Sequence, residues 1–491
     1  MRLSSLIAPI RGAVLQGNDL AITGLCTDSR AVTAGNLFIA VPGTVADGRT
    51  YINEAVAKGA VAVVVEDGTD LAVYPSSVTY VTVPHVRMTL CAMANSYYPR
   101  QPQTIAAVTG TSGKTSTVQF TRDLWQQAGH KAASLGTLGL ITPDTKRYGS
   151  LTTPDPITLH KTLDEITAQG VTHAAMEASS HGIELNRLDQ VHISLGAFTN
   201  LSRDHLDYHK SMESYFAAKL RLFTTIIKRG GTAVLNADIP EFDDLQAVCI
   251  AHGLKVISFG RTGCDLLLLA HLPEPQGQAL RFELLGRPYE IMLPMIGEFQ
   301  IWNSLCALAL TVASGEDPDK MVQAMENLSG VPGRLELIGK TPSGGAVFVD
   351  YAHKPAALEN VLTTLRPHIA ANQGAKLHVV FGCGGNRDKG KRPLMGDIAA
   401  RLADEVIVTD DNPRQEDADT IRREILAGCS ANPHVHEIGN RASAIQTGIE
   451  SLKQGDVLVI AGKGHEEGQI VGNQVLPFND AEEARKVINA L

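Results

Sequence analysis

Short apolar runs recur along the whole chain and alternate with amphipathic stretches of helical period. The runs have the length of strands, and most of them end in polar loops. They lie at 36–41, 60–65, 78–83, 105–108, 172–177, 193–198, 234–238, 347–349, 377–381, 406–409 and 457–460. The helical patterns include 51–58, 85–98, 118–128, 355–365 and 418–426. Strands that alternate with helices predict an α/β fold with parallel sheets.

The same pattern predicts three domains. With 491 residues, the chain is too long for a single hydrophobic core. Pro99-Arg100-Gln101-Pro102 has the composition of a linker. Short runs within 255–296 resemble antiparallel strands, and the α/β pattern resumes from Gly333. We therefore predict a small N-terminal α/β domain at 1–99, a central domain with a mostly parallel sheet at 100–332 and a C-terminal α/β domain at 333–491.

Composition and charge exclude several classes of function. A formal net charge of −9 leaves no surplus of basic residues for general nucleic-acid binding. The longest apolar runs, such as 61–65 and 266–270, are far too short to span a membrane, and the first residues lack a signal-peptide pattern. The seven cysteines form no Cys-x-x-Cys pair, which favours a reducing compartment over a zinc site or a disulfide framework. We expect a cytoplasmic protein with no nucleic-acid partner and no membrane insertion.

The most specific chemical signal is a glycine-rich loop at 110–116. Its residues are Gly110, Thr111, Ser112, Gly113, Lys114, Thr115 and Ser116. A strand, a glycine turn, Gly-Lys-Thr and a helix form a phosphate cradle, in which Lys114 reaches the outer phosphates and Thr115 can bind Mg²⁺. Val108 stands where the longer form of this loop has a glycine, so the match is to the shorter Gly-Thr-x-Gly-Lys-Thr form. The strand and helix context disfavours a plain glycine turn with a solvated lysine, and we predict that the chain binds a nucleoside triphosphate.

Candidate metal ligands follow two later strands. Glu177 ends the run 172–177, where an α/β nucleotide site places its second metal ligand. The segment 199–209 combines acids with histidines such as His205. Because histidine is not a favoured Mg²⁺ ligand, a metal loop and a helix-capping or ion-pair role are equally consistent with this segment. Lys219, taken alone, would be a solvated helix lysine.

Polar loops also follow the C-terminal strands, at 350–353, 382–392, 410–414 and 461–467. Ligands of open α/β sheets bind outside the carboxyl ends of the strands. Arg387, Asn412, Arg414 and Glu466 could hold a small zwitterion, with the arginines on its carboxylate and the acid on its amine. A second phosphate loop is an equally good interpretation of the basic, glycine-rich stretch 382–390.

With these loops in view, the chain resembles the Mur ligases over essentially its full length. The matching segments are 28–30, 110–115, 176–182, 199–207, 297–303, 333–334, 350–353 and the C-terminal loops. The family implies an N-terminal domain for a UDP-sugar substrate, a central P-loop ATPase domain and a C-terminal Rossmann-like domain for the incoming amino acid. The resemblance therefore implies an ATP-dependent, ADP-forming amide ligase of peptidoglycan precursor synthesis that uses Mg²⁺, and we expect it to act as a monomer.

The resemblance also assigns roles to single residues. The catalytic and metal-site residues would be Lys114, Thr115, Glu177, His205 and Lys219, the last as a carbamate in which CO₂ turns a cation beside Mg²⁺ into a carboxylate. The nucleotide would contact the 110–116 loop, Asn303, Arg334 and Asp350, the last two after closure of the third domain. The UDP-sugar substrate would contact Ser29, Thr44, Val45, Ala46, Thr152, Thr153, Ser179 and Arg187. The amino-acid pocket would contain Arg387, Asp411, Asn412, Pro413, Arg414, Gly462 and Glu466.

The Asp-Asn-Pro-Arg motif at 411–414 discriminates among the members of the family. It marks those that add meso-diaminopimelate to UDP-N-acetylmuramoyl-L-alanyl-D-glutamate, and diaminopimelate offers an arginine one more carboxylate than lysine does. The alternatives are the same ligation with L-lysine, a folylpolyglutamate synthetase-like ligase and a non-catalytic ATP switch, which would need no acceptor pocket. Ser112 replaces a usual asparagine, and Leu151 and Leu185 stand where relatives often have polar residues.

Overall fold

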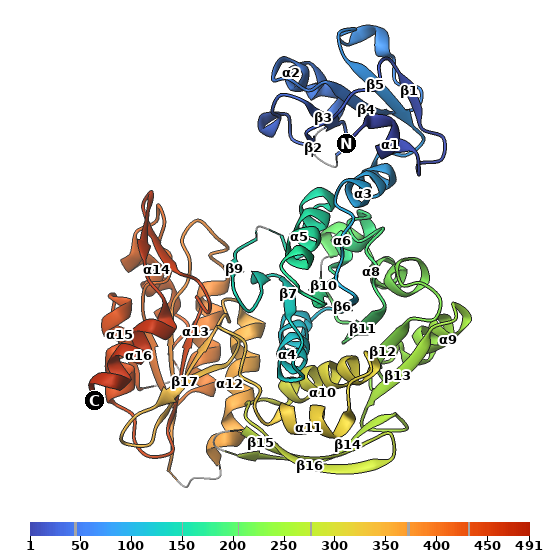
Figure 1. Ribbon diagram of the computed structural model, residues 1–491. Coiled ribbons are helices and arrows are strands. Elements are labelled where there is room, and N and C mark those ends of the chain that lie inside the picture. The colour runs from blue at the N-terminus through green and yellow to red at the C-terminus, as the bar shows by residue number, and fades with distance from the viewer. Residues whose placement is uncertain (44–46, 150, 205, 275–276, 371–373, 431–432) are drawn as a thin grey trace. The chain divides into compact units, whose positions relative to one another are not determined.

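The computed structural model describes residues 1–43, 47–149, 151–204, 206–274, 277–370, 374–430 and 433–491. Its internal contacts divide the chain into two compact units. The first comprises Met1–Leu267, Leu284–Gly286 and Asn303–Met321, and the second comprises Leu268–Glu283, Arg287–Trp302 and Val322–Leu491. Strands and helices alternate within both units, as the sequence pattern predicts (Figure 1).

The N-terminal part of the first unit holds a five-stranded sheet. Its strands are β1 (Val14–Gln16), β2 (Gly24–Cys26), β3 (Asn36–Ile39), β4 (Ala62–Glu66) and β5 (Thr79–Val83), in the order β1-β5-β4-β3-β2, with helices α1 (Leu3–Ile7), α2 (Ile52–Ala57) and α3 (Val86–Tyr97). Leu37 and Val64 pack in one core cluster with α1 and α3, whereas Phe38 and Val63 pack in another with α2. Successive strand side chains point to opposite faces, so strands buried on both faces have the continuous apolar runs seen in the sequence.

Strand β6 (Thr104–Thr109) of the first unit is an interior strand of a larger sheet. Strands β10 (His173–Glu177) and β11 (Leu195–Phe198) pair with β6 on its two sides, both in parallel. The carboxyl ends of these three strands therefore bring the 110–116 loop, Glu177 and Thr199 to one edge of the sheet. Helix α4 (Lys114–Gln127) begins in that loop and buries Trp125. Gly129 follows α4 with φ +94°, as expected of a glycine that ends a helix.

Further strands and helices occur along the chain up to residue 325. The strands are β7 (Ala132–Gly136), β8 (Gly139–Ile141), β9 (Lys146–Arg147), β12 (Thr232–Asn236), β13 (Lys255–Gly260), β14 (Leu266–Glu274), β15 (Gly277–Leu284) and β16 (Arg287–Leu293). The helices are α5 (Pro156–Ala168), α6 (Ser180–Glu184), α7 (Leu206–His209), α8 (Met212–Arg221), α9 (Phe242–Ala251), α10 (Glu298–Ala313) and α11 (Pro318–Met325). Among the helices of the described residues, none is both long enough and apolar enough to cross a bilayer.

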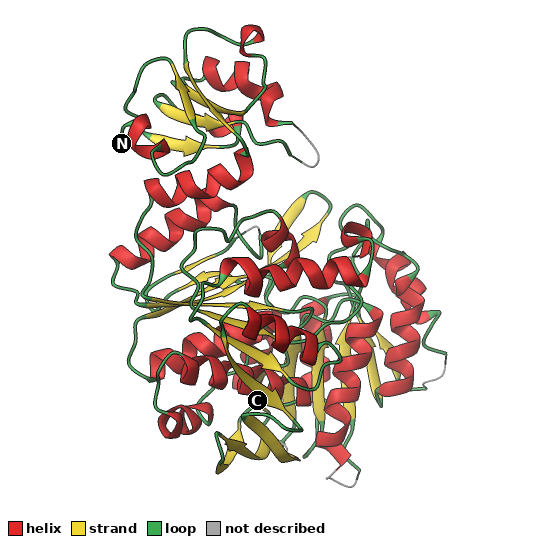
Figure 2. Ribbon diagram, turned by 90° about the vertical axis from the view of Figure 1, so that its right-hand side faces the viewer, coloured by secondary structure: helices red, strands yellow, loops and turns green. Residues whose placement is uncertain are grey.

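The second unit is built on a six-stranded sheet. Its strands β17 (Glu336–Lys340), β18 (Ala346–Asp350), β19 (Leu377–Phe381), β20 (Glu405–Val408), β21 (Val435–Glu437) and β22 (Val457–Ala461) lie in the order β17-β18-β22-β19-β20-β21. Neighbouring strands of this sheet are parallel except for β17 and β18. Helices α12 (Pro355–Ala370), α13 (Lys391–Leu402) and α14 (Ala418–Leu426) pack in one core cluster, and α15 (Arg441–Glu450) and α16 (Asp480–Ala490) pack in another. Figure 2 shows the helices of the chain in red and its strands in yellow. A two-stranded hairpin, β23 (Gly468–Val471) and β24 (Gln474–Pro477), follows β22.

Candidate functional site

The 110–116 loop requires glycine at two positions. Gly110 and Gly113 have φ values of +139° and +86°, a region in which residues with a side chain are strained. A Cβ on Gly110 would lie 2.0 Å from Thr199 Oγ1, and a Cβ on Gly113 would lie 2.3 Å from Asn303 Oδ1. The loop is therefore packed closely against the end of β11 and against α10, and the structure brings Asn303 to it.

Hydrogen bonds hold the loop in this conformation at the N-terminus of α4. Lys114 Nζ donates to the carbonyl oxygens of Gly110 at 2.9 Å and Thr111 at 2.8 Å. The Ser112 N–H donates to Asn200 Oδ1 at 2.9 Å, and Thr199 Oγ1 donates to the Ser112 carbonyl at 2.7 Å. A lysine and the positive end of a 14-residue helix therefore meet at one point, which favours phosphate binding.

Glu177 lies beside this loop and is 2% exposed. Its Oε1 accepts hydrogen bonds from Thr115 Oγ1 at 3.0 Å and from the Thr137 N–H at 2.7 Å. Gly136 makes room for the carboxylate, because a Cβ there would lie 2.2 Å from Glu177 Oε1. A hydroxyl and a carboxylate oxygen are ligands that Mg²⁺ prefers, so this donor set fits the ion.

Lys219 is buried, so the expectation of an ordinary solvated helix lysine is wrong. Its Nζ donates to the Gly110 carbonyl at 2.8 Å and lies 4.2 Å from the centre of the Tyr215 ring. Burial, assisted by the charge of Lys114, lowers the pKa of Lys219 to about 6. The amine is therefore mostly neutral at pH 7, and the neutral amine is the form that reacts with CO₂.

The segment 199–209 is described only in part. His205 lies outside the described residues, so its metal role stays a prediction. His209 is buried, with Nε2 2.9 Å from Ser180 Oγ and Nδ1 3.4 Å from Glu184 Oε2. Both ring nitrogens of His209 therefore face side-chain oxygens of the protein.

The residues predicted to hold the dipeptide part of the UDP-sugar substrate lie together next to Glu177. Thr153 Oγ1 donates to the Glu177 carbonyl at 2.9 Å and lies 3.0 Å from Ser179 Oγ. Arg187 donates to the Thr153 carbonyl at 2.8 Å, and Thr152 Oγ1 lies 3.2 Å from Thr137 Oγ1. These residues therefore form one hydrogen-bonded group around the end of β10.

The other residues predicted for this substrate belong to the N-terminal part of the first unit. Ser29 is buried in a short 3₁₀ helix and donates to Glu54 Oε2 at 2.8 Å. Thr44, Val45 and Ala46 lie outside the described residues. Their contacts with the UDP group stay predictions.

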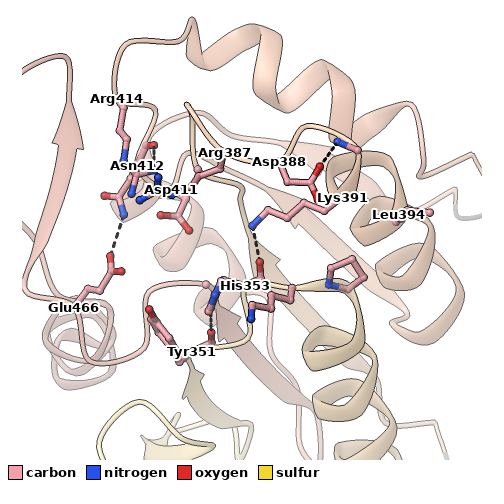
Figure 3. Close-up of a pocket in the computed structure, with 15 residues that line it drawn as sticks. Tyr351, His353, Arg387, Asp388, Lys391, Leu394, Asp411, Asn412, Arg414 and Glu466 are labelled. Atoms are coloured by element: carbon pink, nitrogen blue, oxygen red, sulfur yellow. Dashed lines mark hydrogen bonds between the residues drawn. The ribbon is translucent and has the colours of Figure 1, made fainter. Parts of the chain in front are cut away.

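The second unit contains a pocket of about 840 Å³ at the carboxyl ends of its strands. It is lined by Tyr351, His353, Lys354, Pro355, Gly384, Arg387, Asp388, Gly390, Lys391, Leu394, Asp411, Asn412, Arg414, Gly462 and Glu466. Every residue predicted for the amino-acid pocket is in this lining except Pro413, which is buried between Asn412 and Arg414 in the chain. Figure 3 shows Arg387, Arg414 and Glu466, which come from three different loops, around this pocket.

The polar groups of the pocket form a network with both signs of charge. Asn412 Nδ2 donates to Glu466 Oε2 at 3.0 Å (Figure 3). The buried Lys463 donates to Asn412 Oδ1 and to Glu466 Oε2, both at 3.0 Å. Because acids and bases line the same pocket, it suits a zwitterion better than a phosphate group. Of the two interpretations of this loop cluster, the structure favours the zwitterion site.

Arg414 is positioned by the β23–β24 hairpin. Its backbone N–H donates to the Ile470 carbonyl at 3.0 Å, and its side chain donates to the Gly385 carbonyl at 2.9 Å. The Ile470 N–H donates in turn to Asn412 Oδ1 at 2.9 Å. Arg414 has φ +53°, an unusual value for a residue with a side chain, and the hairpin supplies the contacts that maintain it.

A buried ion pair lies behind the pocket. Arg441 and Asp480 are joined by two hydrogen bonds of 2.7 Å, and both side chains are fully buried. Arg441 also donates to the Ala461 carbonyl at 3.0 Å, one residue before Gly462. The pair therefore ties α15 and α16 to the end of β22, where the pocket begins.

We expect Asp480→Ala to lower the free energy of unfolding of the second unit by about 3 kcal/mol, because it leaves the Arg441 charge buried without its partner. The double variant Arg441→Met/Asp480→Leu should lose clearly less, since neither charge remains. Urea unfolding followed by circular dichroism measures both, with Asn489→Ala on the exposed face of α16 as a control. Equal losses in the single and double variants would contradict this explanation.

Several residues of the pocket were not predicted as site residues from the sequence. Four of them, His353, Lys354, Asp388 and Lys391, line the pocket, and Lys463 donates to the lining residue Glu466. All five lie in or beside loops that the sequence placed at strand ends. Lys391 donates to the His353 carbonyl at 2.7 Å, and burial lowers the pKa of His353. Their position at the ends of predicted parallel strands was the signal that could have found them.

Arg334 and Asp350 are neighbours in the second unit. The Arg334 guanidinium lies 5.1 Å from the centre of the Tyr351 ring. Asp350 accepts hydrogen bonds from the N–H groups of Leu335 at 2.7 Å and Ala352 at 2.8 Å, while burial raises its pKa to about 6. Their contact with the nucleotide stays a prediction.

The chain matches three domain models of one protein family. The matches are to "Mur ligase family, catalytic domain" at residues 21–98, "Mur ligase middle domain" at 108–311 and "Mur ligase, glutamate ligase domain" at 333–464. The 110–116 loop, Glu177 and Lys219 lie within the second match. The lining of the second-unit pocket lies within the third, with the exception of Glu466.

Close relatives carry one name. The chain is 49% identical over 490 residues to the UDP-N-acetylmuramoyl-L-alanyl-D-glutamate–2,6-diaminopimelate ligase of Mesorhizobium japonicum, with 99% of each chain covered. It is 49% identical over 474 residues to the enzyme of the same name from Agrobacterium fabrum, covering 96% of this chain and 94% of the relative. A solved structure with that name is similar with a TM-score of 0.74 and 34% identity, covering 96% of this chain and 95% of the other.

Proposed function

The chain belongs to the Mur ligase family, and we propose that it joins 2,6-diaminopimelate to UDP-N-acetylmuramoyl-L-alanyl-D-glutamate at the expense of ATP. The observation that carries this proposal is the second-unit pocket, in which Arg387 and Arg414 accompany Glu466 and Asn412. A diamino dicarboxylate needs both kinds of partner, because arginines pair with its carboxylates and an acid receives an ammonium group. The predicted domains at 1–99, 100–332 and 333–491 would serve the UDP-sugar, ATP and the amino acid.

The first chemical step is activation of the carboxylate of the substrate. Lys114 exchanges its carbonyl acceptors for phosphate oxygens, while the N–H groups at the start of α4 hold the remaining charge. The D-glutamyl side-chain carboxylate attacks the γ-phosphate, which gives an acyl phosphate and ADP. Thr115 and Glu177 would hold Mg²⁺, which supplies charge neutralisation when bound. The chain's own contribution is positioning and electrostatic stabilisation.

The second step forms the amide bond. The amino group of diaminopimelate attacks the acyl carbon, phosphate leaves with the bonding electrons, and the ammonium proton is released to solvent. Arg387 and Arg414 would hold the carboxylates of the amino acid, and Glu466 would hold its distal ammonium group. Lys463 and Asn412 keep the Glu466 carboxylate in place through hydrogen bonds of 3.0 Å.

The substrate dipeptide would lie against the polar group at the end of β10. Thr152, Thr153, Ser179 and Arg187 surround Glu177 there, so a carboxylate bound by Arg187 would lie on the same side of the sheet as the phosphate loop. Ser29, Thr44, Val45 and Ala46 are proposed to contact the UDP group, and His205 is proposed to contribute to the metal site. Asn303, Arg334 and Asp350 are proposed to contact the nucleotide.

Lys219 is proposed to carry a carbamate that adds an anionic oxygen donor to the metal site. Since burial lowers its pKa to about 6, the reactive neutral amine predominates above that pH and is lost below it. With ¹³C-labelled bicarbonate, we expect a carbamate resonance at about pH 8 that disappears at about pH 5. Lys219→Arg should lack the resonance, and Lys161→Arg, on an exposed helix position, should retain it.

The proposed reaction is tested by phosphate release from ATP in the presence of Mg²⁺ and UDP-N-acetylmuramoyl-L-alanyl-D-glutamate. Meso-diaminopimelate is added to one reaction and L-lysine to another. We expect release to be stimulated by diaminopimelate and the product mass to equal substrate plus diaminopimelate minus water. Stimulation by lysine alone would overturn the choice of amino acid, and release that ignores both amines would overturn the ligase proposal.

A further inference from the structure

Three side chains of types that can bind a metal ion lie together at the amino end of β10, whose carboxyl end lies at the phosphate loop. His173 is the first residue of β10, whose last residue is Glu177. His130 follows the end of α4, and Glu316 follows the end of α10. One ligand atom from each of these three residues lies within 4.8 Å of the other two.

The contacts within this group are close. His130 Nε2 lies 2.7 Å from Glu316 Oε1, and the ring centres of His130 and His173 are 3.9 Å apart. Ligand atoms bound to a tetrahedral zinc ion at 2.0–2.1 Å lie about 3.3 Å from one another. The observed separations, from 2.7 Å up to the limit of 4.8 Å, bracket this value, so the three ligand atoms are spaced suitably for one ion.

The chemistry of the group also suits a transition metal. Two imidazoles and one carboxylate, with a fourth position left to water, form a donor set typical of zinc and unlike that of Mg²⁺. The Thr172 hydroxyl lies 2.9 Å from His173 Nδ1, which orients the ring and leaves Nε2 as its second nitrogen. The side chains of His130 and Glu316 are 33% and 19% exposed, which gives an ion access from solvent.

We propose that His130, His173 and Glu316 bind one divalent transition-metal ion of the zinc class. The ion would join the end of α4, the start of β10 and the end of α10. The same three elements carry Lys114, Glu177 and Asn303, which lie at the phosphate loop. The site is separate from the proposed Mg²⁺ site and uses none of the residues assigned to catalysis. Its role is to fix the relative positions of these elements, so metal binding stabilises the folded chain.

Cobalt spectroscopy tests the site in the full-length chain. After treatment with a chelator, Co²⁺ should give intense visible bands that saturate at one equivalent and are displaced by Zn²⁺, because four-coordinate cobalt absorbs far more strongly than octahedral cobalt on oxygen ligands. The variants His173→Ala and His130→Gln should both lose the bands. The His130 side chain is partly exposed, so its replacement should disturb the fold little. His252→Ala, an exposed histidine at the end of α9, should keep them.

Thermal unfolding gives an independent readout. At a zinc concentration of about 100 times the dissociation constant, the midpoint should rise by about 5 °C in the wild type and in His252→Ala but not in His130→Gln. Absence of the bands in the wild type, or retention of both bands and stabilisation in His130→Gln, would overturn the proposal. Ligase activity is not needed for either readout, so the result is independent of the proposed reaction.

Discussion

Lys114→Ala is expected to lower kcat for ATP-dependent ligation by about 10³-fold or more, because it removes a preorganised cation from the phosphate loop. The lysine lies at the first turn of α4 and its Nζ already points along the loop, 2.8–2.9 Å from two backbone carbonyls. Alanine is the best helix former, so the fold of α4 and the positions of Gly110 and Gly113 should be retained. Steady-state phosphate release and product mass measure the loss.

A matched control distinguishes the effect of losing Lys114 from the effect of losing another lysine of the same unit. Lys161→Ala removes an exposed helix lysine of the same unit and should leave kcat unchanged. Circular dichroism and binding of the UDP-sugar substrate should be similar in both variants, since Lys114 contacts the loop and not the proposed dipeptide surface. Near-normal ligation by Lys114→Ala would contradict the assignment of the 110–116 loop as a phosphate cradle.

The nucleotide site could be predicted from the sequence because the residues of its phosphate loop are contiguous in the chain. The 110–116 loop combines the strand end, the glycines, Lys114 and the helix start within a few residues, and Glu177 ends a recognisable apolar run. The alternation of apolar runs with helical patterns likewise predicted the parallel sheets. The fold class was confirmed for this reason, since local patterning and tertiary packing agree at these positions.

Other features could not be predicted because they depend on contacts between distant residues. Thr137 donates to Glu177 across 40 positions, and Lys463 meets Asn412 across 51. Burial of Lys219 under the phosphate loop is also a tertiary property, and its helical context alone indicated a solvated lysine. The β23–β24 hairpin has an exposed second strand without an apolar alternation, so no pattern revealed that it positions Arg414.

Arg414→Ala should raise the KM for diaminopimelate by about 10²-fold while the KM for ATP stays the same, because one charged hydrogen-bonding partner of the amino acid is lost from the pocket. Arginine and alanine both carry a Cβ, so the backbone strain of φ +53° at position 414 is similar in the wild type and in the variant. This strain therefore does not account for the change in KM. L-lysine lacks the second carboxylate, and the kcat/KM ratio of diaminopimelate to lysine should therefore fall as well. Initial rates with each amino acid measure both quantities.

Two variants of the same loop sharpen this result. Arg414→Lys keeps the charge but loses the planar fork, so it should recover only part of the affinity for diaminopimelate. Gln415→Ala changes the next residue, which is exposed and outside the pocket lining, and it should behave as the wild type. Equal increases in the KM for ATP and for diaminopimelate in Arg414→Ala would assign this arginine to the folding of the loop. A selective increase, together with reduced discrimination against lysine, places it on a carboxylate of the amino acid, because only that contact distinguishes the two substrates.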